Sequence, residues 1–138
     1  MKNNWNLIGN PYPSAISVDD FFNENSSILG IVPVSPTIDG LSEGVIFIWS
    51  QSAPPDSNNP GNENQNFKQS DYAIINYSTE VAGGDGVKPD RYIPSGQSFF
   101  ISYDHNAPEI DANGFIKRNE IIFKNSMRMA DITSNSQF

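Results

Sequence analysis

The residues of this sequence that best suit a binding site are aromatic. Sugar rings stack on flat aromatic side chains, and amides and carboxylates commonly surround such sites on loops or on an exposed sheet face. The sequence supplies both kinds of group, because 17 Asn residues accompany its Tyr and Trp residues. The candidate ligand-binding residues are Tyr12, Trp49, Tyr72, Tyr77 and Tyr92.

Each of these aromatic residues also has a purely structural interpretation. Trp49 ends an apolar run, residues 45–49, and is more typical of a core side chain than of a ligand-binding one. Tyr72 and Tyr77 have opposite strand parity, so they cannot share one flat sheet face without a bulge. Prolines on both sides of Tyr12 predict a turn or an extended rim that either displays the ring or folds it back as a lid.

One polar loop contains candidate calcium ligands. Calcium prefers carboxylate and carbonyl oxygens on adaptable loops, and Asp104, Asp111 and Asn113 precede Gly114 in such a loop. The remaining spacing does not match an EF-hand, and Asp-x-Asn-Gly is also ordinary turn chemistry. We therefore expect no cofactor, with calcium as the one alternative left open.

The sequence contains few residues that could form a catalytic site. There is no cysteine, His105 is the only histidine, and the segment Ser95-Gly96-Gln97-Ser98 is not a nucleophile elbow. These absences argue against a nucleophilic triad and against zinc. Two carboxylates could in principle hydrolyse glycosides, but Asp19 and Asp20 are better explained by the start of a helix. We expect a protein that is not an enzyme.

Length and charge exclude further classes. A chain of 138 residues fits one domain, and its net charge of -8 argues against a nucleic-acid partner. No stretch approaches the roughly 20 apolar residues of a membrane span, so we expect no membrane insertion.

The composition predicts strands. The chain has 16 Ile but only 3 Leu, together with many turn-forming Asn, Ser, Gly and Pro residues. Strands are expected at residues 5–9, 45–49, 72–77, 97–103, 115–116 and 120–123, with an irregular edge strand within 28–38. The continuously apolar run 45–49 predicts a central strand covered on both faces. Ser17 followed by Asp20 predicts a short helix that Phe21 and Phe22 anchor on the core and that ends by Asn25.

About seven short strands separated by turn signals are typical of an all-β fold. We predict an antiparallel β-sandwich of jelly-roll type, with one short helix near the N-terminus. Because a strand begins almost at the first residue, we expect residues 1–138 to be a single module taken from a longer protein.

Several ordered motifs also resemble a known family. They are the segments W-N-L-I-G-N-P-Y-P-S at 5–14, I-F-I-W at 46–49, D-Y-A at 71–73, Y-I-P-S-G-Q-S-F-F at 92–100, F-K-N-S-M-R at 123–128 and N-S-Q-F at 135–138. Together they resemble a module of large secreted proteins of Bacteroidetes-type bacteria that adjoins a sorting domain for type IX secretion. Ser98 departs from this pattern, because a glycine is usual there.

The resemblance implies a secreted or cell-surface location and defines no activity. We therefore carry two hypotheses. The first is a noncatalytic extracellular binding module for adhesion, with a glycan or another surface ligand as its partner. The second is a structural spacer whose partners are the neighbouring domains of the parent chain and which has no ligand of its own.

Overall fold

The structure is a computed structural model, and it describes residues 4–26, 42–50, 71–103 and 120–131. Its elements, in chain order, are β1 (Asn4–Gly9), β2 (Ile16–Ser17), α1 (Val18–Glu24), β3 (Ser42–Trp49), β4 (Tyr72–Asn76), β5 (Glu80–Val81), β6 (Tyr92–Ile93), β7 (Ser98–Tyr103) and the 3-10 helix η2 (Asn125–Met127). The predicted all-β fold with one short helix near the N-terminus is confirmed. None of the described helices is long and apolar enough to cross a membrane.

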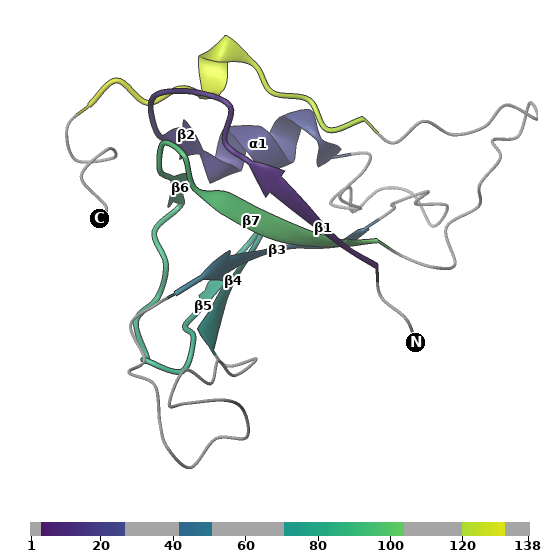
Figure 1. The fold of residues 1–138 in the computed structure, drawn as a ribbon, viewed down its shortest axis with the longest axis vertical. Helices are drawn as coiled ribbons and strands as arrows, with labels where there is room; N and C mark the ends of the chain where they lie inside the picture. The colour runs from purple at the N-terminus through teal and green to yellow at the C-terminus, as the bar shows by residue number, and fades with distance from the viewer. Residues whose placement is uncertain (1–3, 27–41, 51–70, 104–119, 132–138) are drawn as a thin grey trace, which may run out of the picture.

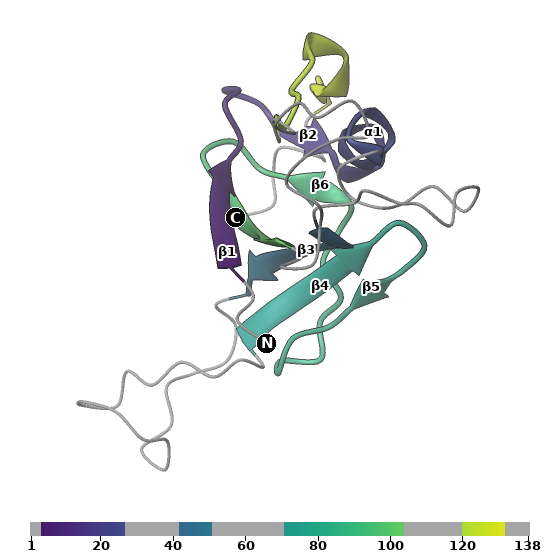
Figure 2. The same ribbon diagram turned by 90° about the vertical axis from the view of Figure 1, so that its right-hand side faces the viewer.

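The strands form two antiparallel sheets. The larger has the order β1-β7-β3-β4-β5, and the smaller pairs β2 with β6. Helix α1 and the small sheet lie on the same side of the large sheet (Figures 1 and 2). The predicted jelly-roll sandwich stays a prediction, since the layer described over the large sheet is one helix and two short strands.

The hydrophobic core fills the space between these two layers. From the large sheet it receives the side chains of alternate residues on β3, β4 and β7, which define its inner face. The covering layer contributes both phenylalanines of α1, which are fully buried as predicted. The core side chains are Ile16, Val18, Phe21, Phe22, Ile46, Ile48, Ile75, Ile93, Phe99, Ile101 and Met127.

Helix α1 begins as the sequence predicts. The Ser17 side chain accepts a hydrogen bond from the Asp20 backbone N–H at 3.2 Å, and Asp19 and Asp20 lie in the first turn. The helix ends at Asn25, whose own N–H donates to the Phe21 carbonyl. A seven-residue helix has little stability alone, so its cap and its two buried rings fix it on the core.

Replacing the cap tests this account of α1. Ser17→Ala removes the acceptor for the Asp20 N–H, and we expect a loss of about 1 kcal/mol in the free energy of unfolding. Urea denaturation would measure the loss, and Ser78→Ala is the control because Ser78 is exposed and its recorded hydrogen bond uses the backbone N–H. Equal effects of the two substitutions would contradict the cap assignment.

Residues 120–123, predicted as a strand, are not one. Asn25, only 1% exposed, takes the place of a neighbouring strand here. Its side-chain oxygen accepts from the Ile122 N–H at 2.7 Å, and its amide donates to the Ile122 carbonyl at 3.0 Å. The segment therefore packs beside α1, where Phe123 contacts Phe21. The other predicted strands at 28–38 and 115–116 lie outside the described residues.

The turn before β7 explains why residue 96 is a glycine. Gly96 has φ +74°, and the Gln97 N–H donates to the Pro94 carbonyl at 3.2 Å. Only Gly adopts such a φ without strain, so Gly96 is the position that the turn requires. Ser98, which stands where the resembling family usually has a glycine, is the first residue of the extended strand β7.

Candidate ligand-binding face

The large sheet has a second face, opposite the core, which we call the outer face. Register places a single row of side chains across all five strands on this face, because each residue is the paired partner of the next. The row is Leu7, Phe100, Phe47, Ile74 and Val81. Every member is apolar, and its two ends on the edge strands are 61% and 50% exposed.

The outer face corrects one sequence prediction. The run 45–49 was expected to be covered on both faces, but only Ile46 and Ile48 are buried, whereas Phe47 and Trp49 are half-buried. A solvated sheet face normally carries polar residues in alternation with the core residues. An apolar row on such a face is therefore a sign of a binding surface.

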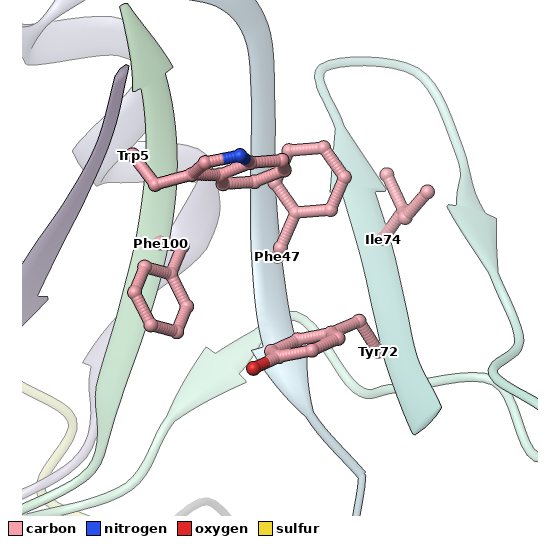
Figure 3. Close-up of a pocket in the computed structure, with 5 residues that line it drawn as sticks. All are labelled: Trp5, Phe47, Tyr72, Ile74 and Phe100. Carbon is pink, nitrogen blue, oxygen red and sulfur yellow. The ribbon is translucent and has the colours of Figure 1, made fainter. Parts of the chain in front are cut away.

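A pocket of about 360 Å³ lies on the outer face. It is lined by Trp5, Phe47, Tyr72, Ile74 and Phe100, which come from β1, β3, β4 and β7 (Figure 3). None of these side chains is charged, and Trp5 is 47% exposed. We call this the aromatic pocket.

Edge-to-face contacts hold the rings of the pocket in place. The Trp5 ring centroid lies 4.5 Å from that of Phe47 and 6.2 Å from that of Phe100, with interplanar angles of 71° and 89°. Tyr72 meets Phe100 at 5.9 Å and 75°. Such T-shaped pairs are the preferred arrangement of aromatic rings. As Figure 3 shows, Trp5 and Tyr72 stand on opposite sides of the pocket, both seen nearly edge-on.

Of the five aromatic residues predicted from sequence, only Tyr72 lines the aromatic pocket. Trp49 lies beside it, with its ring 4.9 Å from the Tyr72 ring at an interplanar angle of 79°. The two residues are paired across β3 and β4, so both belong to the outer face. Tyr77 follows the end of β4 and is 51% exposed, away from the residues that line the pocket.

Tyr12 and Tyr92 occupy other places. Tyr12 packs partly against the core, 6.5 Å from the Phe123 ring, and the Arg128 guanidinium lies 5.6 Å from its ring centre. Tyr92 lies on β6 and lines a second pocket of about 240 Å³ at the end of β3. Trp49, Asp85, Lys88, Asp90 and Gln97 also line this second pocket.

The remaining members of the aromatic pocket were not predicted as site residues. Trp5 and Phe47 were assigned to strands, and Phe100 to a core strand. The alternation of Trp5 and Leu7 with polar neighbours could have indicated one apolar face on β1. The sequence could not show that this face meets Phe100 and Phe47, because strand order and register are long-range properties.

The acidic residues near the sheet edge have structural partners. Arg91 binds Asp19 at 2.6 Å and also pairs with Glu80, which joins the start of α1 to β5. Burial lowers the pKa of Arg91, but its hydrogen bonds to both carboxylates and their charges outweigh burial, so the pKa is raised. The Asp85 carboxylate accepts from the Ser50 hydroxyl and the Val87 N–H, each at 3.0 Å.

The calcium prediction lies outside the part of the chain that can be examined. Asp104, Asp111 and Asn113 are not among the described residues, and neither is His105. Across 4–26, 42–50, 71–103 and 120–131, no group of three or more His, Cys, Asp or Glu side chains could hold a metal ion.

With the fold and the face described, comparison with known proteins places the chain in a family. A family model matches residues 1–138, the whole of the sequence. The chain belongs to the family described as Domain of unknown function (DUF8693). No curated protein and no solved structure matches this DUF8693 chain.

Proposed function

We propose that this DUF8693 chain is a noncatalytic extracellular binding module that captures a glycan on its outer face. The observation that carries the proposal is the aromatic pocket, in which a ligand can contact several rings that are already held in place by their neighbours. Binding pockets are typically concave, largely apolar and preformed. The lining residues lie on four strands, and this also favours binding, because a rigid site loses little conformational entropy when a ligand binds.

Extracellular location and function in adhesion belong to the same proposal. They rest on the resemblance of the motifs at 5–14, 92–100 and 123–128 to modules beside a type IX sorting domain. The structure accounts for the first of these motifs physically. Asn10 fixes the turn after β1 by three hydrogen bonds from its amide, and this turn leads the chain away from the strand that carries Trp5.

A structural spacer is the second candidate. The same apolar row would then pack against a neighbouring domain of the parent chain instead of a ligand. The exposure of Leu7 and Val81 at the two ends of the row favours it, because a row that spans the whole sheet exceeds the area that one sugar covers.

A glycan array probed with and without calcium separates the two candidates. We expect the module to bind a subset of glycans, and chelation of calcium to leave this binding unchanged because the described pocket residues carry no carboxylate. Binding that needs calcium would instead assign the site to the segment with the predicted calcium ligands Asp104 and Asp111. An array on which no glycan binds would contradict the binding module and favour the spacer.

A further inference from the structure

We propose that the aromatic pocket takes one sugar ring of a neutral glycan chain, held between the faces of Trp5 and Tyr72. This inference rests on the proposed function and adds to it the class of glycan and the residues that select it. Its basis is the arrangement of the two outer rings, the absence of charge from the five described lining residues, and the positions of the cations that the structure describes.

The two outer rings form the walls of the pocket. Trp5 and Tyr72 each make a T-shaped contact with Phe100, at 89° and 75°, so both stand steeply on the same central ring. Figure 3 shows Trp5 and Tyr72 on opposite sides of the pocket, with the Phe47 ring beside the Trp5 indole and the Phe100 ring to one side, between the levels of the two walls. A flat sugar ring with apolar C–H groups on both faces can stack on an aromatic wall from either side.

The size of the pocket limits its occupant. At about 360 Å³ it lies near the lower end of the range for ligand pockets, roughly 300–1,000 Å³. It therefore holds one ring at a time, and the rest of the chain extends along the row of apolar side chains.

The lack of cations among the described lining residues favours neutral sugars over acidic ones. The chain has a net charge of -8, and the five described lining residues include no Lys or Arg to pair with a uronate or sulfate group. Arg91 and Lys124 are bound to carboxylates, Arg128 lies against Tyr12, and Lys88 lines the second pocket. An acidic sugar would thus enter an apolar site without a counter-charge, which is strongly unfavourable.

Two polar atoms at the walls can orient the ring. They are the indole N–H of Trp5 and the hydroxyl of Tyr72, both visible in Figure 3. A neutral sugar hydroxyl can accept from the first and either donate to or accept from the second. A few such groups on an otherwise apolar pocket are typical of sites that bind a ligand in one orientation.

Calorimetric titration of the intact chain tests the inference. Cellohexaose, mannohexaose and xylohexaose serve as neutral probes, and oligogalacturonate and oligoalginate serve as acidic ones. We expect at least one neutral probe to bind and neither acidic probe to do so. Trp5→Ala and Tyr72→Ala should each weaken binding by about tenfold or more, as removal of a central aromatic contact typically does.

Matched variants separate binding from folding. Tyr77→Ala removes a tyrosine that is 51% exposed and does not line the pocket, so its affinity should equal that of the unmodified chain. Trp5→Phe and Tyr72→Phe keep a flat ring but lose the indole N–H or the hydroxyl, so they should recover part of the affinity lost in the alanine variants. Circular dichroism and the urea midpoint check that each variant is folded.

Each result decides the inference. Neutral binding that both alanine variants weaken supports it. Binding of acidic probes alone, or neutral binding that survives both alanine variants, overturns the inference but leaves a glycan-binding module. If no probe binds and no glycan on the array binds either, both this inference and the proposed function are contradicted. A dimer that Trp5→Ala dissociates would assign the pocket to a second copy of the chain and overturn the inference.

Discussion

Asn10→Asp is expected to destabilise the fold by about 3–5 kcal/mol, although the two side chains have nearly the same shape. The Asn10 amide nitrogen donates to the carbonyls of Ser14, Ile93 and Pro94 at 2.8, 3.0 and 3.0 Å, in a site only 8% exposed. A carboxylate oxygen in its place would face three carbonyl oxygens with no proton to share. We expect the Tm to fall by on the order of 10 °C.

The control for this substitution lies on the preceding strand. Asn6→Asp makes the same chemical change at an exposed position of β1 and should alter the free energy of unfolding by less than about 0.5 kcal/mol. Urea denaturation of both variants gives the comparison. If Asn10→Asp were as stable as Asn6→Asp, the three hydrogen bonds could not be what fixes the turn after β1.

Alanine substitution of two adjacent phenylalanines should give very different losses of stability. Phe99 is fully buried on the inner face, in contact with Phe21 at 5.2 Å, whereas Phe100 is half-buried on the outer face. We expect Phe99→Ala to cost about 3–5 kcal/mol, because it leaves a cavity in the core. Phe100→Ala should cost about 1–2 kcal/mol, because its ring is already partly in water.

Phe100→Ala should also affect binding. Phe100→Ala removes the ring on which both Trp5 and Tyr72 stand, so it should weaken the affinity for a neutral oligosaccharide while the chain stays folded. Both variants keep the same backbone strand, and each serves as the control for the other. Equal losses of stability, or a larger loss for Phe100→Ala, would show that the assignment of the two faces is wrong.

The sequence predicted best what local signals determine. The Ser17 cap and the two buried rings of α1 depend on residues within a few positions of one another. These features agree with the structure. The extended character of residues 5–9, 45–49, 72–76 and 98–103 also follows from composition and alternation.

Features that depend on distant partners were predicted less well. Residues 120–123 have the composition of a strand, but the buried Asn25 side chain, 97 positions away from Ile122, satisfies the backbone there instead. The run 45–49 has the composition of a fully covered strand, but its outer side is open to the aromatic pocket. Tyr72 was one of five aromatic residues selected from the sequence by residue type, whereas Trp5 and Phe100 acquire their role only through register.

Fluorescence of Trp5 tests the central claim, that ligand binds on the outer face, most directly. The chain has two tryptophans, so Trp49→Phe leaves Trp5 as the only indole and keeps a ring beside Tyr72. Titration of this variant with the tightest neutral oligosaccharide should shift the Trp5 emission to shorter wavelength and protect it from acrylamide quenching, with saturation at the calorimetric Kd. Unchanged Trp5 emission and quenching at ligand concentrations that saturate the calorimetric signal would contradict the claim.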